Sequence, residues 1–307
     1  MRRPSLRIAQ AALTLVAAAA LVWSLQLLAP GDPARRVLVA NGVSSPTPAQ
    51  VAALHTELGL DEPTPARLAR WLVSAARGDL GTSWRTGAPV TAELAERLPA
   101  TLRLAAVALG LALLLAIPLA LTAVAGRNRL PDLGGRGLMF LGASAPSFVV
   151  GTLLLEVVVL RLGIGRVLAD GSWGGAVLPA IPLALAAAAV WARVLRGAML
   201  DVGTRRHVHV ARARGAGRLR VLLVHVLPGA SPPLLAAIGM TIGSLLAGAA
   251  VVETVFTWPG IGPYLIDAIV ARDVPVVQGT VLLGVLAYVV ASMVADLAAA
   301  AIEPGRR

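Results

Sequence analysis

The sequence predicts an all-α integral membrane protein with six transmembrane helices. Hydrophobic residues make up 57% of the 307 residues and charged residues only 14%, which is far from the composition of a soluble domain. Six apolar runs are each about twenty residues long or a little longer, enough to cross a bilayer as a helix. The predicted spans are residues 8–29, 101–125, 137–160, 177–196, 232–254 and 279–301.

The first apolar run follows a short basic stretch that contains Arg2, Arg3 and Arg7. A cleaved signal peptide has the same basic-then-apolar pattern and is the alternative interpretation. The run is longer than a usual signal core, and no Ala-x-Ala site clearly ends it before Pro30. We therefore expect residues 1–30 to form an N-terminal tail and the first transmembrane helix.

Residues 31–100 are polar and mix arginines with aspartates and glutamates, as a folded segment outside the membrane would. Thr47 followed by Pro48 predicts a helix start, because proline is favoured in the first turn. A second amphipathic helix is predicted from Pro65 to Arg77, entered through Thr64 and closed by Gly78. This region is expected to be an extracytoplasmic segment.

The arginine distribution predicts the topology. All 27 basic residues are arginines, so the chain lacks the lysine of a phosphate-binding loop and is not itself a P-loop ATPase. A net charge of +11 could suggest nucleic acid, but arginines of multispanning proteins gather on cytoplasmic loops. Residues 126–136 carry three arginines against one aspartate, and residues 193–220 carry eight against Asp201. We expect these loops and both termini, including the tail 303–307, to be cytoplasmic.

The loop at 201–228 is the most distinctive stretch of the chain. Arg212, Arg214, Arg218 and Arg220 lie around two glycines, Gly215 and Gly217, between two long apolar runs. Glycine at a helix end permits a sharp turn or a close backbone approach. The pattern predicts a short helix, a break at 215–217 and a second helix, offered to a partner.

This loop resembles the cytoplasmic coupling loop of ABC-transporter permeases. In the general motif, a Glu-Ala-Ala triplet begins six residues before a glycine, and Leu-Pro follows. Here His209-Val210-Ala211 stands at the triplet without its glutamate, and Gly215 and Leu227-Pro228 match. The peptide-permease branch usually lacks that glutamate too and carries an Ala-Arg-Ala-Lys-Gly core, from which this chain differs only by Arg214.

Three other motifs extend the resemblance over nearly the whole chain. They are residues 28–33 (Leu-Ala-Pro-Gly-Asp-Pro), residues 78–83 (Gly-Asp-Leu-Gly-Thr-Ser), and a block at 251–279 that contains Glu253, the turn Trp258-Pro259-Gly260, and Ala271-Arg272-Asp273. Together they are similar to the first permease subunit of a dipeptide, oligopeptide or nickel importer. The resemblance implies a type I ABC importer permease fold, with the permease core at 101–302.

The resemblance implies roles for two groups of residues. The ATPase-coupling residues would be His209, Ala211, Arg212, Ala213, Arg214, Gly215, Leu227 and Pro228. The external gate or the contact for a binding protein would be Glu253, Trp258, Pro259, Gly260, Asp267, Arg272 and Asp273, with a polar interface or a solvated face as the alternative. Glu156 and Asp296 are ionisable residues within predicted spans and candidates for the translocation path. Pairing of Glu156 with Arg161 is the competing interpretation.

The resemblance also implies the partners. These would be a homologous second permease, two ABC ATPase subunits that bind ATP and magnesium, an extracytoplasmic substrate-binding protein and the lipid bilayer of a bacterial-type cytoplasmic membrane. This chain would bind no cofactor and no nucleic acid. The substrate would be a di- or oligopeptide, although nickel, glutathione and other small solutes use close relatives.

Two other function classes fit the sequence less well. A self-sufficient secondary transporter or channel would typically show internal repeats with broken spans and would not need a glycine-broken basic loop. An intramembrane enzyme needs a catalytic dyad, and none is evident in the sequence. The chain has no cysteine, and its four histidines are too scattered to predict a metal site. We therefore expect a transport subunit without catalytic or metal-binding residues.

Overall fold

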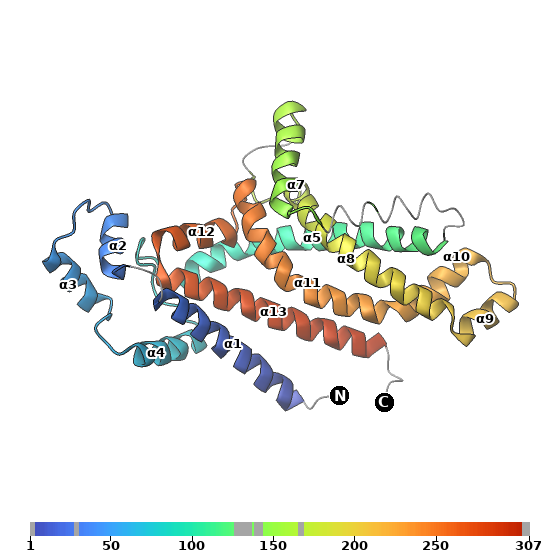
Figure 1. The fold of residues 1–307 in the computed structure, drawn as a ribbon, viewed down its shortest axis with the longest axis horizontal. Helices are drawn as coiled ribbons and strands as arrows, with labels where there is room; N and C mark the ends of the chain where they lie inside the picture. Colours follow the sequence, from blue (N-terminus) through green and yellow to red (C-terminus); the bar gives the residue numbers. More distant parts are fainter. Residues whose placement is uncertain (1–3, 28–30, 126–136, 138–143, 165–168, 303–307) are drawn as a thin grey trace. The chain divides into compact units, whose positions relative to one another are not determined.

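The computed structural model describes residues 4–27, 31–125, 137, 144–164 and 169–302 (Figure 1). Every secondary-structure element assigned in these residues is a helix, so the all-α prediction is confirmed for them. An isolated pairing of Thr82 with Pro89 is the one β-type bridge among the described residues.

Fourteen helical elements follow one another along the described chain. They are α1 (Pro4–Leu27), α2 (Pro33–Ala40), α3 (Pro48–Glu57), α4 (Thr64–Ala76), α5 (Val90–Ala125), α7 (Ser147–Leu154), the π-helix η1 (Leu155–Arg161), α8 (Val177–Gly203), α9 (Arg206–Ala213), α10 (Arg218–Arg220), the π-helix η2 (Val221–Val226), α11 (Leu227–Val255), α12 (Ile261–Ala271) and α13 (Val274–Ile302).

Within the described residues, four helical stretches are long and apolar enough to span a membrane. They are Val90–Val124, Val177–Gly203, Arg218–Leu246 and Val274–Ala295. Each overlaps a span predicted from the sequence. The stretches Ala12–Ser24 and Ile261–Ala271 are apolar but shorter. Four spans are therefore supported, and the total of six stays a prediction.

The predicted third span, residues 137–160, is not one continuous helix in the described residues. Ala145 and Pro146 are not helical, and α7 begins at Ser147. Proline has no amide hydrogen and disfavours helical geometry in the residue before it, so it starts a helix here instead of continuing one. Residues 138–143 of this predicted span lie outside the described residues.

The second predicted span also differs in its start. Helix α5 begins at Val90 instead of residue 101, so Glu93 and Arg97 lie within the same helix as the apolar run. Arg97 forms an ion pair with Glu93 one turn earlier. This i, i+4 pair lets the helix continue into a polar stretch where apolar periodicity alone gave no signal.

The chain forms two compact units. One contains Ala100–Pro259 and Val290–Arg307, and the other contains Met1–Pro99 and Gly260–Val289. The first unit has a core built from small residues: Ala112, Ala116 and Ala120 recur every fourth residue of α5 and are fully buried beside a row of α8 alanines. Alanines at this spacing share one helix face and let helices approach closely.

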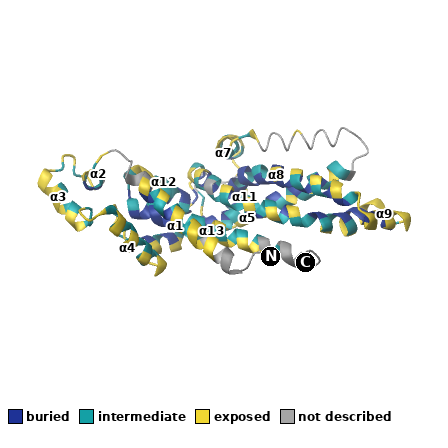
Figure 2. Cartoon of the chain, turned by 60° about the horizontal axis from the view of Figure 1, so that its bottom comes forward, coloured by how far each residue is buried: buried dark blue, intermediate teal, exposed yellow. Residues whose placement is uncertain are grey.

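Helices α8 and α11 lie side by side in this unit (Figures 1 and 2). Trp191 of α8 is fully buried, and its indole Nε1 donates a hydrogen bond to Thr241 Oγ1 of α11 at 3.0 Å. A buried indole needs such an acceptor because an unpaired N–H is costly away from water. The bond fixes the register of α8 against α11.

The other unit holds the segment after α1. The helix start predicted at Thr47 is confirmed, whereas α4 begins at Thr64, one residue before the predicted Pro65, with Pro63 as its N-cap. Thr47 caps α3 in a capping box: its side chain accepts from Gln50 N, and the Gln50 side chain accepts from Thr47 N. Helix α4 ends before Gly78, which has a φ of +86°. Glycine adopts this left-handed conformation without the steric cost of a side chain.

Two arginines of this unit lie over aromatic rings. The guanidinium of Arg67 in α4 lies 5.3 Å from the ring centroid of Trp23 in α1, and that of Arg97 lies 4.6 Å from the Tyr264 ring in α12. Both distances are within the range of cation–π attraction. These contacts join α1 to α4 and α5 to α12.

Candidate functional site

The basic loop between α8 and α11 has the helix, break and second helix that the sequence predicts. Helix α9 ends at Ala213, and Gly215 has a φ of +81°. Gly215 N donates to Arg212 O at 3.0 Å and Ala216 N donates to Ala211 O at 3.1 Å. This pair of bonds is a Schellman motif, in which a left-handed glycine ends the helix. Helix α10 then starts at Arg218.

Helix α9 is mostly exposed (Figure 2), but Val208 and Ala211 on one side of it are buried. Val208 is fully buried with Val221, Leu222 and Val226 of η2 in one apolar cluster. His207 Nε2 lies 3.3 Å from the carbonyl oxygen of His225, to which it can donate. Apolar contact and a hydrogen bond thus hold α9 against the start of the following helix.

The predicted coupling residues divide between these two sides. His209, Arg212, Ala213, Arg214, Gly215 and Pro228 are exposed, Leu227 is half-buried, and Ala211 is buried. Ala211 lies three residues after Val208, so it shares the inner face of α9. Its small side chain packs inward and is not offered to a partner.

The exposed side of the loop is strongly basic. Arg205 pairs with Asp201 at 3.1 Å, but Arg206, Arg212, Arg214 and Arg220 have no carboxylate within ion-pair distance among the described residues. A hollow of about 830 Å³ lies between α9, the glycine turn and η2, lined in part by Arg206, Arg214 and Arg220. This arrangement can bind an anionic group or an acidic protein surface.

Glu253 is a buried residue of α11, just before the turn that contains Trp258. It is 0% exposed near the end of α11, and its carbonyl oxygen accepts from Trp258 N at 2.7 Å. Trp258 is also 0% exposed, and its Nε1 donates to Ala100 O at 3.0 Å. Thr257 between them has a left-handed φ of +47°, which is uncommon for a residue with a side chain. Within this chain the side chain of Glu253 is therefore buried, whereas the alternative interpretation placed it at a polar interface.

Pro259 and Gly260 complete this turn, and only Pro259 is exposed. The Cγ of Pro259 lies against Gly171, where an added Cβ would be 3.1 Å away. The predicted gate residues therefore include three buried positions, Glu253, Trp258 and Gly260.

Only one of the three predicted charged contact residues after this turn is exposed. Asp267 is exposed on α12, and Arg272 is half-buried with a left-handed φ of +57°. Asp273 is 2% exposed and accepts hydrogen bonds from Ser83 Oγ, Trp84 N and Arg85 N. Asp273 therefore binds a loop of its own chain instead of presenting its charge to a partner.

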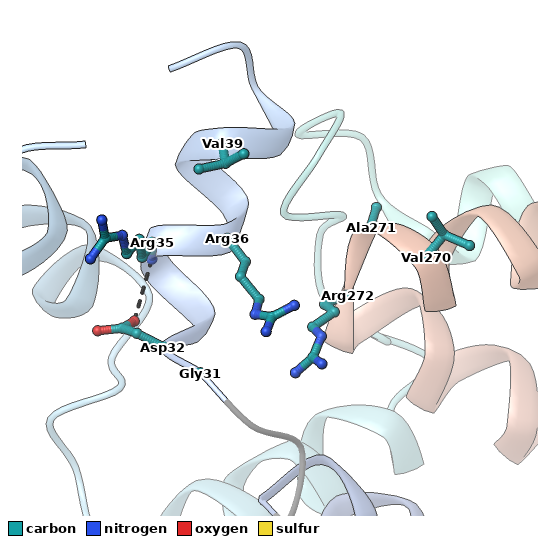
Figure 3. A pocket seen from close by; sticks show the side chains of 8 residues that line it. All are labelled: Gly31, Asp32, Arg35, Arg36, Val39, Val270, Ala271 and Arg272. Carbon is teal, nitrogen blue, oxygen red and sulfur yellow. Dashed lines mark hydrogen bonds between the residues drawn. The ribbon is translucent and has the colours of Figure 1, made fainter. Parts of the chain in front are cut away.

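A second basic hollow of about 500 Å³ lies between α2 and the end of α12 (Figure 3). The side chains of Arg36 and Arg272 extend toward one another there. The Asp32 carboxylate is turned elsewhere: it lies 3.0 Å from His55 Nε2 and accepts from Ala34 N at 2.8 Å. Burial raises the pKa of Asp32, but hydrogen bonds from His55 and the backbone outweigh it, so the pKa falls below its usual value.

Glu156 pairs with Arg161, the competing interpretation of this residue. Glu156 Oε1 lies 3.0 Å from both Arg161 Nε and Nη2. Residues five apart point about 140° away from each other on an α-helix. Both lie in the π-helix η1, whose i to i+5 periodicity brings them onto one face. Asp296 lies in α13, and the prediction for its side chain falls outside what the structure describes.

A groove between α7, α8 and α11 carries no charge. It encloses about 510 Å³, and its lining is small, aliphatic or hydroxylated, with Ser147, Val190, Met240, Thr241 and Ser244 among the residues. Met240 is 76% exposed on this side of α11. Among the described residues, no three His, Asp or Glu side chains gather in a way that could hold a metal ion.

Sequence reasoning missed two of these relationships. The contact of Ser83 with Asp273 joins the motif at residues 78–83 to the block at 251–279, and the presence of both motifs in one chain was the available signal. The pairing of His55 with Asp32 had no such signal. The two residues are 23 positions apart, and that spacing does not belong to any recognised sequence motif.

The apolar helices and the basic loop between two of them are the features expected of the membrane subunit of a transporter. The chain belongs to the family of binding-protein-dependent transport system inner membrane components, whose model matches residues 112–307. Residues 2–105 match the model of the N-terminal region of such membrane components.

Several relatives match nearly the whole chain. It is 38% identical over 295 residues to the glutathione transport system permease protein GsiC of Salmonella paratyphi A, covering 96% of this chain and 95% of the relative. The proteins of the same name from Pectobacterium atrosepticum and Escherichia coli K12 are 36% identical over 294 and 295 residues, with the same coverage. The predicted family is therefore confirmed: the chain is a permease component of a binding-protein-dependent ABC importer.

Proposed function

We propose that this chain forms half of the translocation path of an ATP-driven importer and couples that path to separate ATPase subunits through α9. The observation that carries the proposal is the α9 loop. Its inner face is anchored by Val208, and its outer face presents Arg212 beside the Gly215 turn. A short helix that is packed on one side and exposed on the other can transmit a movement of a bound partner to the helices on which it packs.

The anchoring explains how such a push would reach the membrane. Val208 packs in one cluster with Met199 and Val202 of α8 and with Val226, the last residue of η2 directly before α11. Because close-packed side chains yield little, a displacement of α9 moves the ends of both apolar helices. ATP binding by the partner subunits would thereby switch the path between inward-facing and outward-facing states.

We assign the uncharged groove between α7, α8 and α11 to the wall of the path. Hydroxyl groups such as Ser147 and Ser244 can exchange hydrogen bonds with a peptide backbone without holding it tightly. A second permease would supply the opposite wall. The names of the relatives support a peptide-type substrate such as glutathione, and selectivity among peptides would reside mainly in the binding protein.

The alternative of a self-sufficient secondary transporter or channel is not favoured. The family is binding-protein-dependent, and the relatives are permeases of a transport system. The remaining partners are a second permease, two ATPase subunits and a binding protein outside the membrane. This chain would itself carry no catalytic residue and no cofactor.

Site-specific cross-linking tests the proposal. The chain has no cysteine, so a single cysteine at exposed Arg212 can be cross-linked to the ATPase subunits in the purified complex. A cysteine at Arg85, exposed in the segment predicted to be external, is the control. We expect cross-links from Arg212→Cys only, with uptake of labelled glutathione or dipeptides that requires ATP and the binding protein. Equal cross-linking from both positions, or uptake without ATP, would contradict the proposal.

A further inference from the structure

The hollow beside α9 has the chemistry of an anion-binding site. Arg206 lines it from α9, Arg214 from the glycine turn and Arg220 from α10. No aspartate or glutamate lines the hollow, and none of the three arginines has an ion-pair partner among the described residues. Arginine keeps its charge at every physiological pH and binds phosphate oxygens through paired N–H groups.

The two walls of the hollow are held at a defined distance. His207 on α9 can donate to the carbonyl oxygen of His225 on η2, with 3.3 Å between the nitrogen and the oxygen, and both histidines line the hollow. Arg220 precedes η2 and lies five residues before His225. The π-helical i to i+5 periodicity turns these two residues toward the same side, whereas an α-helix would separate them by about 140°.

The segment that supplies Arg220 and His225 also exposes apolar side chains. Leu219 is 69% exposed, and Leu223 and Val224 are exposed on η2. This segment opens the stretch Arg218–Leu246, which is long and apolar enough to span a membrane. A ligand that fits both features has an anionic head and a hydrocarbon tail.

We propose that this hollow binds the phosphate of an anionic phospholipid of the cytoplasmic leaflet. Basic pockets beside transmembrane helices on the cytoplasmic side are suited to such headgroups. The proposal rests on the proposed function only for the cytoplasmic placement of the loop. The bound headgroup neutralises Arg206, Arg214 and Arg220. Arg212, on the outer face of α9, stays available to the ATPase.

Lipid retention by the purified complex tests this proposal. Native mass spectrometry of the whole complex would count phosphatidylglycerol molecules that remain bound in the presence of excess phosphatidylcholine. The variant is Arg220→Gln, and the matched control is Arg218→Gln, because both arginines are exposed on α10 but only Arg220 lines the hollow. We expect retention to fall about tenfold in the variant, the loss typical of one hydrogen bond to a charged group, and to be unchanged in the control.

Several outcomes would overturn the lipid assignment. Equal losses in the two variants would mean that phosphatidylglycerol responds only to net charge. Displacement by millimolar inorganic phosphate would make the hollow a site for soluble anions. Release of the lipid on adding ATPase subunits to the separated permease would mean that acidic protein side chains occupy it. If Arg220→Gln loses lipid but keeps ATPase cross-linking at position 212, the proposed function stands independently.

Discussion

The Ser83 hydroxyl donates a hydrogen bond to the buried carboxylate of Asp273, 190 positions further along the chain. The same carboxylate accepts from the backbone amides of Trp84 at 3.0 Å and Arg85 at 3.3 Å. A carboxylate is stable in a buried position when several donors surround it. One side chain at the junction of α12 and α13 thereby holds the loop that leads into α5.

This relationship predicts that Asp273→Asn destabilises the unit that contains both residues. The amide keeps the shape but replaces one acceptor oxygen with a donor, which leaves buried groups unpaired at a cost of about 1–3 kcal/mol. The thermal midpoint of the purified complex should fall, and proteolytic cleavage near residues 82–87 should become faster. Asp267→Asn, an exposed change on the neighbouring helix, should leave both measurements unchanged. Equal effects of the two substitutions would contradict the structural role.

Gly215 and Gly217 form a matched pair for testing the coupling loop. An added Cβ meets no atom within 4 Å at either position, but Gly215 has a φ of +81° whereas Gly217 has an ordinary φ of −61°. A side chain at Gly215 therefore strains the backbone by about 1–2 kcal/mol without a clash inside this chain. A clash would arise only against a partner.

We expect Gly215→Ala to reduce the stimulation of ATP hydrolysis by the loaded binding protein about fivefold or more, the equivalent of that strain. Gly215→Val adds bulk and should also abolish uptake into vesicles. Gly217→Ala should behave as the parent. Normal stimulation and uptake in both Gly215 variants would show that the turn has no part in coupling.

The burial of Glu253 changes what its replacement should do. At a polar interface, Glu253→Ala would affect transport and leave assembly intact. Because the side chain is fully buried, its removal leaves a cavity and should cost about 2 kcal/mol or more. Yield and thermal midpoint of the complex should fall together with uptake. Glu253→Gln preserves the volume of the side chain. If this variant assembles fully but loses uptake, Glu253 has a role in transport.

The pairing of Asp32 with His55 predicts a pH dependence of stability. The pKa of Asp32 is lowered in the folded protein relative to its ordinary value of 3.8. A lowered carboxyl pKa means that the folded state favours the ionised form, so its stabilisation is present above the unfolded pKa and is lost as the pH falls through the folded pKa.

As the pH falls from about 5 to about 3, the thermal midpoint of the parent chain should therefore decrease more steeply than that of Asp32→Asn. Tryptophan fluorescence is a suitable signal because Trp71 lies in α4 of the same unit. Glu57→Gln, an exposed change on α3, is the control and should keep the slope of the parent. Identical slopes for the parent and Asp32→Asn would rule out this contribution.

Both termini are predicted to be cytoplasmic, with residues 31–100 outside. Reporters that are active on only one side of the membrane, fused after Gly87 and after Arg307, measure this directly. We expect opposite activities at the two positions, because the arginine-rich loops set the orientation. The same activity at both positions would mean that the number of spans or the orientation is wrong.

The sequence by itself determined the features that depend on neighbouring residues. Thr47 and Gln50 cap a helix because they lie three positions apart, and Gly215 ends α9 because glycine adopts a left-handed turn. The apolar runs predicted the location of the four supported spans in the same way. These effects act within one or two turns of helix, so a single sequence contains all the information that they need.

Only the tertiary structure decided which polar groups are buried and what they contact. Carboxylates such as Glu253 and Asp273 are usually found at the surface of a protein. Here Glu253 is buried beside a turn that packs against α5, and the loop that begins at Ser83 encloses Asp273. The pairing of Glu156 with Arg161 depends on a π-helical turn, and sequence periodicity assumes an α-helix. Burial and long-range hydrogen bonds depend on which segments meet in space, and that is set by the packing of all the helices together.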